Sequence, residues 1–546
     1  MKKQTTRFIF ITLCILLCFS VLFGCVDEGD KTPECTEHSF GDWEEVVDPS
    51  EPHECQDKEY ERTCSVCGEK EEKGGSEEDH LWELKWGIKP TCKRGGYDIY
   101  VCSICNKEKG VDLPIKNDHT LGDEYETTAD EHYKICSVCD KAIGTEKHIY
   151  EDDKCTVCHT FKEYYEISMW VQNGYMGTNL FAKQIKEFAD ANKVTIKLTA
   201  SEKDGVVAGN DIMNDPSCAP DIFCFTQSEL QGLIDAEAIM PLSDAEAEQI
   251  KATHCYGAAL ASSENGVLYG YPLAITERVS ILYYDKSLIS EDDAKSLEKI
   301  IDICEKNNKF FRFQLSSGWG VEFFFRSTGC QSSWTVNKDF EFVALDDNYN
   351  SDAGIAAMKA IAKLASSPAF NNDAYSHNYG NDTPIIISEL GNRWIAQNTF
   401  GENLGITILP SFTVDGESYQ MKSVGSTFLL GISPTEDSKK AELLSRLALW
   451  LIDEKCQLER YDLFEWCPTN LAAQASERVK SNPYHQIQIQ QYNMSVPERH
   501  KNSYWYYIAG DLYLAAKDAK TDEEIIAALN RYDERVNLLF EKGEYQ

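Results

Sequence analysis

The chain has 546 residues, 21 cysteines and a formal net charge of −37 at pH 7, with 90 acidic against 53 basic side chains. So large a negative charge disfavours nucleic acid, anionic lipid headgroups and anionic substrates as partners, because all of these require basic patches. A neutral ligand fits this composition best, and the length predicts two or more domains.

The N-terminal segment is typical of an export signal. Two lysines and an arginine precede an apolar run from Phe8 to Phe23, which is shorter than the ~20 residues that a membrane-spanning helix requires. The run ends at Leu22-Phe23-Gly24-Cys25, which resembles a bacterial lipobox. We therefore expect residues 1–25 to form a lipoprotein signal peptide, with Cys25 carrying a palmitate-type diacyl anchor on the outer face of the cell membrane of a Gram-positive bacterium. A single transmembrane anchor is the alternative.

The cysteines are unevenly distributed. After the expected signal peptide and a short linker over residues 26–34, eleven of them lie between Cys35 and Cys158, and seven are scattered singly through the rest of the chain. Exported proteins commonly use disulfides. The scattered cysteines, however, stand mostly in apolar surroundings, as in DIFCFT around Cys224, and such cysteines behave as small buried hydrophobes. We therefore expect the compartment outside the cell membrane to be only weakly oxidising.

Residues 35–160 contain four degenerate repeats. Each opens on a histidine and contains one Cys-x-x-Cys pair, here called a knuckle. Assigning each opening histidine to its own repeat gives every repeat four soft or borderline ligands, the number that tetrahedral zinc requires. The predicted ligand sets are His38, Cys55, Cys64 and Cys67; His80, Cys92, Cys102 and Cys105; His119, His132, Cys136 and Cys139; and His148, Cys155, Cys158 and His159. Cys35 and His53 are left over, and Cys35 could replace His38.

The repeats predict structural rather than catalytic metal. Units this short with few aliphatic residues cannot build a core, so metal binding would supply the free energy of folding. A catalytic zinc would require an open position and a nearby acid or base as in His-Glu-x-x-His, which is absent here. The stretch resembles zinc-ribbon-like repeats that act as spacers in surface proteins of Firmicutes, which implies a stalk with four structural zinc ions and no catalytic cofactor. Disulfide-closed loops remain the alternative.

From residue 164 onward the pattern changes to that of an α/β protein. Residues 164–173, 194–200 and 218–226 read as strands, and residues 178–193 read as a helix with Leu180, Ile185 and Phe188 on one face. This alternation predicts a parallel sheet with helices on both faces. Residues 266–289 contain a break followed by a new strand, which indicates a chain crossing between lobes.

Several segments carry a family resemblance. YGYPLAITERVSILYYDKSLI resembles the inter-lobe crossing of ABC-transporter solute-binding proteins of the carbohydrate class, which includes the maltose- and maltodextrin-binding proteins. PDIFCFTQSELQGLIDAEAIMPL, SELGNRWIAQ, GITILPSF, VGSTFLLGISPTEDSKKAELLSRLALWLID and NSYWYYIAGDLYLA continue the match in the family's order. The resemblance covers residues 164–546. It implies a type II periplasmic-binding-protein-like fold with two α/β lobes and a hinge, the first lobe spanning about 164–274 and resuming near Val424.

The resemblance also implies a sugar site in the cleft. Aromatic rings would stack on the C–H face of a pyranose, and planar polar groups would bond its hydroxyls. The residues at the family's binding positions are Gln172, Asn173, Phe225, Gln227, Glu277, Arg278, Trp319, Trp394 and Trp505. Trp450 is expected in the core, Trp334 and Trp466 are expected to pack rather than bind, and Glu277 could instead pair with Arg278.

Three classes of function remain. The resemblance favours a monomeric, non-catalytic subunit that captures an oligosaccharide, with α-1,4 maltodextrin as first guess, and delivers it to ABC-transporter permease subunits. The second class is a glycan-active enzyme, which would need two carboxylates flanking a cleft. Because the chain has 90 acidic residues, counting them cannot exclude such a pair. The third class is a surface adhesion protein in which the zinc repeats carry the function.

Overall fold

The computed structural model describes residues 37–46, 59–73, 80–173, 179–337, 341–373, 382–499 and 501–543. The expected signal peptide, Cys25, the linker over residues 26–34, Cys35 and Cys55 lie outside these ranges. The chain divides into two compact units that exchange short segments. The first unit contains the chain up to Glu126 together with Tyr133–Thr145, and the second contains Thr127–His132 together with the chain from Glu146 onward. In the described part of the chain, no helix is both long and apolar enough to cross a membrane.

The first three repeats each form a small three-stranded sheet. The strands are β1 (Glu44–Val46), β2 (Glu59–Thr63) and β3 (Lys70–Lys73); β4 (Trp82–Ile88), β5 (Gly96–Cys102) and β6 (Glu108–Leu113); and β7 (Glu126–Thr127), β8 (Glu131–Ile135) and β9 (Ala142–Lys147). The fourth repeat has only the hairpin β10 (Tyr150–Glu151) and β11 (Lys154–Cys155).

A tight turn closes every knuckle one residue after its second cysteine. The residues in that turn are Gly68, Asn106, Asp140 and His159, and all four have positive φ angles, between 60° and 76°. Glycine, asparagine and aspartate adopt this left-handed conformation most readily. His159 therefore occupies the turn position of its repeat, where the other repeats carry Gly, Asn or Asp.

The first lobe of the second unit is built on a five-stranded sheet. Its order is β13 (Thr195–Glu202), β12 (Tyr164–Val171), β14 (Ile222–Thr226), β28 (Thr427–Ile432) and β17 (Tyr271–Ile275). Strand β12 runs parallel to β13 and β14, whereas β28 runs antiparallel to β14 and β17. The predicted parallel sheet is thus confirmed for the first three strands, with one reversed strand added by the returning chain.

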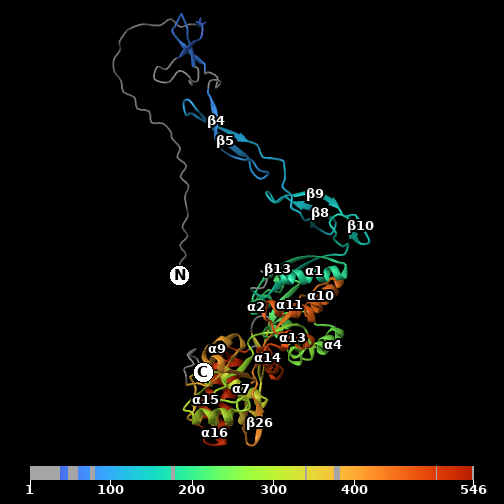
Figure 1. Cartoon of the computed structure of the whole chain (residues 1–546), viewed down its shortest axis with the longest axis vertical. Helices are drawn as coiled ribbons and strands as arrows, with labels where there is room; N and C mark the ends of the chain where they lie inside the picture. The colour runs from blue at the N-terminus through green and yellow to red at the C-terminus, as the bar shows by residue number, and fades with distance from the viewer. Residues whose placement is uncertain are drawn as a thin grey trace, which may run out of the picture. The chain divides into compact units, whose positions relative to one another are not determined.

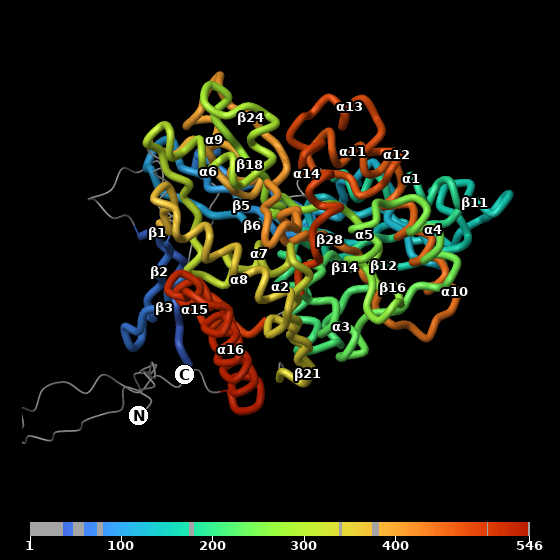
Figure 2. The backbone as a smooth tube through the Cα atoms, turned by 90° about the horizontal axis from the view of Figure 1, so that it is seen from below, coloured from blue at the N-terminus to red at the C-terminus, as the bar shows by residue number. Residues whose placement is uncertain are grey.

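Alternation along β14 places helices on both faces of this sheet. Ile222 and Cys224 belong to a core with α1 (Leu180–Asn192) and α10 (Ser438–Leu451). Phe223 and Phe225 point the other way, into a core with α2 (Gly205–Asn214) and α3 (Leu230–Asp235). Figure 2 shows α1 on one side of these strands and α2 and α3 on the other. Side chains alternate along a strand, so a strand covered on both faces is apolar throughout, as β14 is.

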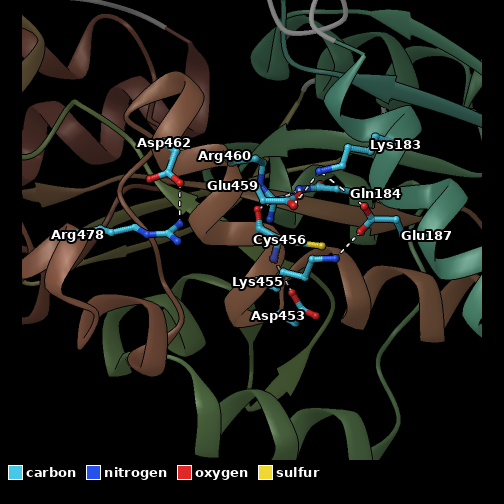
Figure 3. A network of polar contacts seen from close by, with 10 residues as sticks. All are labelled: Lys183, Gln184, Glu187, Asp453, Lys455, Cys456, Glu459, Arg460, Asp462 and Arg478. Atoms are coloured by element: carbon cyan, nitrogen blue, oxygen red, sulfur yellow. Dashed lines mark hydrogen bonds and ion pairs between the residues drawn. The ribbon is translucent and has the colours of Figure 1, made fainter.

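A polar network joins α1 to α11 (Glu454–Phe464) in the first lobe (Figure 3). Gln184 and Arg460 are both fully buried, and the Arg460 guanidinium donates to Gln184 Oε1 at 2.8 Å. The Gln184 amide in turn donates to the Cys456 carbonyl at 3.1 Å and to Glu459 at 3.0 Å. Burial lowers the pKa of Arg460 to about 10, which still leaves the side chain charged at neutral pH.

The second lobe is built on the three-stranded sheet β23 (Ile385–Glu389), β18 (Ser280–Asp285) and β24 (Leu404–Thr407). One face of β18 packs into a large core that also contains Trp334 and Trp505, and the other face packs against α9 (Arg393–Phe400). The remaining helices of this lobe are α6 (Leu297–Lys306), α7 (Gly318–Thr328), α8 (Asp352–Ala365), α15 (Trp505–Asp518) and α16 (Asp522–Lys542). Its short strands are β19 (Phe311–Arg312), β20 (Ser332–Val336), β21 (Phe342–Asp347), β22 (Phe370–Asn371), β25 (Ser411–Val414) and β26 (Glu417–Gln420).

The chain passes between the lobes three times, and Figure 1 shows the lobes with α14 between them. The first passage is the loop between β17 and β18, which contains Glu277 and Arg278. The second is at β27 (Val424–Gly425), close to the predicted return, and β27 pairs with β29 (Val496–Pro497) on the third passage. The remaining elements of the first lobe and hinge are α4 (Asp244–Thr253), α5 (Tyr256–Ala261), β15 (Ser263–Glu264), β16 (Val267–Leu268), α12 (Leu471–Gln474), α13 (Glu477–Lys480) and α14 (Pro483–Met494).

Candidate functional site

A depression of about 380 Å³ lies between the lobes at the first crossing. Ile275, Phe428 and Trp466 line it from the first lobe, and Glu389, Gly391 and Asn392 line it from the second. Thr276, Glu277 and Arg278 contribute from the crossing itself, and His485 and Gln488 contribute from α14. Its volume falls within the range of small-molecule pockets, and both lobes and the hinge contribute walls.

Glu277 bridges the crossing and the second lobe. Its carbonyl oxygen accepts a hydrogen bond from the Gly391 amide at 3.5 Å. A Cβ atom at Gly391 would lie 2.8 Å from the Glu277 carboxylate, so a larger residue at position 391 would require that flexible side chain to shift. Partial burial raises the pKa of Glu389, and the charge of Glu498 acts in the same direction. The charge of the nearby Arg278 opposes this shift without reversing it.

The floor of the depression contains neutral polar groups. Burial lowers the pKa of His485 to about 4, so the imidazole is uncharged at neutral pH, and its Nδ1 lies 3.1 Å from the Tyr461 hydroxyl. The Gln488 amide donates to the Thr276 carbonyl at 2.8 Å, and its oxygen finds no partner within the described chain. A buried amide oxygen without a partner is costly and can accept from a ligand hydroxyl.

Only some of the sequence-predicted binding residues lie at this depression. Glu277 and Arg278 line it, and both are exposed. Trp394 is 54% exposed and stands two residues after Asn392, at the start of α9. Trp319 is 45% exposed and stacks on Tyr506, with ring centroids 4.7 Å apart and planes inclined by 17°. Both tryptophans therefore offer ring surface to a ligand.

Trp505 occupies a different position from the one expected. It is fully buried in the core of the second lobe, where its indole N–H donates to the Tyr532 hydroxyl at 2.8 Å. That hydroxyl donates in turn to the Asp347 carboxylate at 2.7 Å. With no exposed ring face, Trp505 supports the fold, and its neighbour Tyr506 presents the accessible ring.

The polar loops of the first lobe are also used internally. Phe225 and Gln227 are fully buried, and the Gln227 amide donates to the Gly425 carbonyl. Gln172 accepts from the Gly205 amide at 2.8 Å and thereby supports the start of α2. Asn173 is exposed. Trp334 and Trp466, which were expected to pack rather than bind, are 2% and 7% exposed. Trp450, which was expected in the core, is partly buried against Phe188.

The sequence reasoning missed Glu389, Asn392, His485 and Gln488. Asn392 lies inside the segment GNRWIAQ, directly before Arg393 and Trp394, but only Trp394 of this segment is among the predicted binding residues. His485 and Gln488 belong to α14, whose buried side chains are His485, Gln488, Gln491 and Tyr492. A helix that buries polar side chains shows no hydrophobic periodicity, and its inward face is therefore invisible in the sequence.

The knuckles assemble into Cys/His clusters. In the first unit, the first cluster is His38, Cys64 and Cys67, the second is His80, Cys102 and Cys105, and the third is Cys92, His119, Cys136 and Cys139. The fourth cluster, in the second unit, is His132, His148, Cys155 and Cys158. Within each cluster the potential ligand atoms all lie within 4.8 Å of one another. Thiols and imidazoles that converge in this way are suited to bind a metal ion.

The ligand groups differ from the predicted own-repeat sets at three positions. Cys92 lies in the third cluster, with its Sγ 3.5 Å from Cys136 Sγ, rather than with the second knuckle. His132 lies in the fourth cluster, with its Nδ1 3.4 Å from His148 Nδ1, rather than with the third knuckle. His159 is exposed and forms the knuckle turn, so its side chain takes no part. Each complete cluster thus takes its fourth member from the preceding repeat.

Hydrogen bonds orient the cluster histidines. His148 Nε2 lies 3.1 Å from the Thr128 carbonyl oxygen, and His38 Nε2 lies 3.1 Å from the Glu69 carboxylate. An imidazole that donates from Nε2 presents the Nδ1 lone pair to the cluster, the usual support for a metal-bound histidine. Among the thiols, burial opposes ionisation of Cys136, but the amides of Val138 and Cys139 outweigh it and lower its pKa to about 6.

Comparisons with known proteins agree with this architecture. Residues 183–486 match the family model described as bacterial extracellular solute-binding protein. A comparison with curated protein sequences finds no match.

Solved structures resemble the fold at low sequence identity. The ligand-free maltodextrin-binding protein MalE1 of L. casei BL23 is 20% identical with a TM-score of 0.56, over 68% of this chain and 98% of that one. The extracellular solute-binding protein of Staphylococcus aureus in complex with maltose is 16% identical with a TM-score of 0.54, over 68% and 98%. The maltose-binding protein MalE of Listeria monocytogenes in complex with maltose is 15% identical with a TM-score of 0.54, over 70% and 99%. These likenesses concern the fold. Because the family model covers more than half of the sequence, the chain belongs to the bacterial extracellular solute-binding protein family.

Proposed function

We propose that this protein captures a neutral oligosaccharide in the inter-lobe depression and delivers it, without catalysis, to the permease subunits of an ABC importer. The observation that carries the proposal is the combination of exposed carboxylates, an arginine and a partnerless buried amide oxygen at the lobe crossing. Such groups suit the hydroxyls of a sugar, whereas a net charge of −37 disfavours an anion. The leader sequence supports a lipid anchor at Cys25.

The roles divide between polar and aromatic residues. Glu277, Arg278 and Asn392 would form hydrogen bonds with hydroxyls, and the Gln488 amide oxygen would accept a hydrogen bond from a sugar hydroxyl. Trp394 and Trp319 would supply stacking surfaces, because both expose a large ring area. Among possible sugars, α-1,4 maltodextrin is our first choice, since two of the solved relatives bind maltose.

A panel of oligosaccharides tests this function. Thermal shift identifies binders, because a ligand that binds only the folded state raises its stability by RT ln(1 + [L]/Kd). We expect maltotriose or maltotetraose to raise the melting temperature, with isothermal calorimetry giving the affinity. Cellotriose is the matched control for linkage. Released glucose after prolonged incubation would contradict a non-catalytic role, and failure of every neutral sugar to bind would refute the proposal.

We further propose zinc as the metal of the Cys/His clusters. The complete clusters are a Cys₃His set and a Cys₂His₂ set, both of which are structural zinc sets. Tetrahedral zinc places neighbouring ligand atoms roughly 3.3–3.8 Å apart. In the third cluster, Cys92 Sγ lies 3.5 Å from Cys136 Sγ, and Cys139 Sγ lies 3.3 Å from His119 Nδ1. In the fourth cluster, His148 Nδ1 lies 3.4 Å from His132 Nδ1 and 3.3 Å from Cys158 Sγ.

Burial supports a metal core. Between residues 37 and 160, the buried described residues are Gly96 and six cluster members: Cys64, His80, Cys102, His132, Cys136 and Cys155. Large apolar side chains stay outside, for example Leu81 at 62% and Ile149 at 66% exposure. The described part of the repeats therefore has no hydrophobic core to stabilise it, which supports metal binding as the source of folding free energy. Elemental analysis of the purified protein is expected to find about four zinc ions, and an absence of zinc with paired cysteines would refute this assignment.

A further inference from the structure

The knuckle of one repeat and the hairpin of the repeat before it meet at a single cluster. Cys92 stands in the turn between β4 and β5 of the second repeat, ten residues before that repeat's own knuckle begins at Cys102. Its sulfur nevertheless lies against the knuckle of the third repeat, 3.5 Å from Cys136 Sγ. Beside it, Lys93 Nζ pairs with Asp140 Oδ2 at 3.3 Å, across the same two repeats. The contact between these repeats is therefore polar and centred on a sulfur.

The Cys92 turn has its own hydrogen bonds. The Thr91 hydroxyl accepts from the amides of Lys93 and Arg94, both at 3.2 Å. The Thr91 carbonyl accepts from Lys116, in the segment that leads into the third repeat, at 3.1 Å. The turn is thus shaped independently of the second knuckle, and it presents the thiol of Cys92 to the third.

The fourth cluster repeats this arrangement. His132 follows the turn after β7 in the third repeat, and its Nδ1 lies 3.4 Å from His148 Nδ1 and 3.9 Å from Cys155 Sγ. His148 also donates its backbone amide to the Asp130 carbonyl at 3.1 Å. Residues 127–132 belong to the same compact unit as the fourth repeat.

The fourth cluster is in turn joined to the solute-binding lobe. The Thr195 hydroxyl of β13 accepts from the Phe161 amide at 2.7 Å and donates to the Phe161 carbonyl at 3.0 Å. The Tyr164 hydroxyl of β12 donates to the Thr127 carbonyl at 3.2 Å. Residues 127–132, the fourth knuckle and the first two strands of the lobe therefore form one connected structure.

We propose that Cys92 and His132 are cross-repeat metal ligands, so that each bound ion links a knuckle to the hairpin of the preceding repeat. Metal binding then does two things in one step: it closes the knuckle and attaches the neighbouring hairpin. A stalk built in this way is a chain of metal crosslinks, and the last crosslink holds residues 127–132 onto the solute-binding domain. The inference rests on the zinc proposed above.

Amide hydrogen exchange of the full-length, zinc-loaded protein distinguishes the two possible ligand assignments. The third knuckle is reported by the amides of Cys136, Ser137 and Asp140, which donate to Lys141, Thr120 and Cys136 at 3.0, 2.9 and 2.9 Å. The second knuckle is reported by Cys102, Ser103 and Asn106, which donate to Lys107, Leu81 and Cys102, each at 2.9 Å. The opening free energy of each knuckle determines its protection.

With Cys92→Ser, we expect the amides of the third knuckle to lose their protection while those of the second knuckle keep theirs, with one zinc ion fewer per chain. With Cys105→Ser, the pattern reverses. Cys218→Ser, at an exposed cysteine of the solute-binding lobe, is the control and changes neither. If Cys92→Ser instead releases the second knuckle, or both knuckles together, the cross-repeat assignment is wrong.

His132→Gln tests the fourth cluster independently. We expect protection to fall at the Cys155 amide, which donates to Thr160 at 2.8 Å, and to persist at the third knuckle. His159→Asn is the matched control, because asparagine suits the left-handed turn and His159 is outside the cluster. Loss of protection at the third knuckle in His132→Gln would overturn the inference. A wild-type protein without metal would refute the zinc proposal instead, so the two failures are distinguishable.

Discussion

The backbone of Glu277 and the backbone of Gly391 are joined by a hydrogen bond, from the Gly391 amide to the Glu277 carbonyl at 3.5 Å, across the boundary between the crossing loop and the second lobe. The side chain of Glu277 lies where a Cβ on Gly391 would approach it to 2.8 Å. Gly391 therefore leaves space for this carboxylate in the depression, and a larger residue at position 391 would require the carboxylate to shift.

Glu277→Gln is expected to weaken oligosaccharide binding by about 1–2 kcal/mol. A carboxylate accepts hydrogen bonds from hydroxyls more strongly than an amide does, and hydrogen bonds to charged groups contribute roughly 1.5–3 kcal/mol. Isothermal calorimetry with the best sugar of the panel measures the change. Glu436→Gln, at an exposed carboxylate that does not line the depression, is the control. Equal sugar affinity of the Glu277 variant and the wild type would show that Glu277 does not bind the sugar.

Trp394→Ala is expected to reduce sugar affinity by roughly 2 kcal/mol or more, the scale of an aromatic hot spot. The side chain is 54% exposed, so its removal opens no core cavity, and the melting temperature without ligand should hardly change. Calorimetry and a thermal melt of the same preparation check both halves of the statement. An unchanged affinity in a folded variant would mean that the ligand does not reach α9.

Trp505→Ala should act through stability. The residue is fully buried and its indole donates to the Tyr532 hydroxyl, so truncation leaves a cavity and removes one of the two hydrogen bonds of that hydroxyl. Removal of a buried aromatic side chain costs about 3–5 kcal/mol. Urea denaturation, read by far-ultraviolet circular dichroism, measures the loss. A variant that is as stable as the wild type but binds sugar more weakly would show instead that Trp505 contacts the ligand.

The fold was predictable because its evidence is local and repetitive. The apolar run of β14, the amphipathic face of α1 and the break around Glu277 each follow from spacing along the chain. The antiparallel direction of β28 is not local, since it depends on a return of the chain some two hundred residues after β14. The order of the family's segments supplied that return, near Val424.

The binding and metal sites were less predictable because ligands and cores use the same residue types. Trp394 and Trp505 look alike in the sequence, and only the partner Tyr532, far along the chain, identifies the second as a core residue. The ligand assignment of Cys92 and His132 failed because counting four ligands per repeat cannot tell which knuckle a hairpin faces. His159 did carry usable evidence, since it aligns with Gly68, Asn106 and Asp140 at the turn.

Chelation of zinc should affect the repeats far more than sugar binding. Apart from Gly96, the buried residues in the described part of the repeats are all cluster residues, whereas the solute-binding lobes have hydrophobic cores of their own. After treatment with a strong chelator, we expect amides of residues 80–160 to exchange freely and the sugar affinity to change by less than about twofold, which corresponds to under 0.5 kcal/mol. A large loss of affinity would show that the fourth cluster stabilises the binding lobe through Phe161 and Thr195.

The buried carboxylate of Glu229 should make stability depend on pH. Glu229 is 6% exposed, and burial raises its pKa to about 7, although the hydroxyls of Thr226 and Ser228 act in the opposite direction. In the unfolded chain its pKa is near the ordinary value of about 4.3, so the unfolded state releases this proton first as the pH rises. The contribution of the protonated side chain is fully present below pH ~4 and is lost as the pH rises through ~7.

Glu229→Gln removes this titration while keeping the shape of the side chain and an oxygen that can accept from Ser228, which bonds Glu229 at 2.7 Å. Relative to the wild type, the variant should gain up to roughly 3 kcal/mol of stability between pH 4.5 and pH 8. Urea denaturation at both pH values measures the difference, and Glu248→Gln, an exposed carboxylate on α4, provides the control. If the stability difference between Glu229→Gln and the wild type is the same at pH 4.5 and pH 8, the pKa of Glu229 in the folded protein is not raised above its value in the unfolded chain.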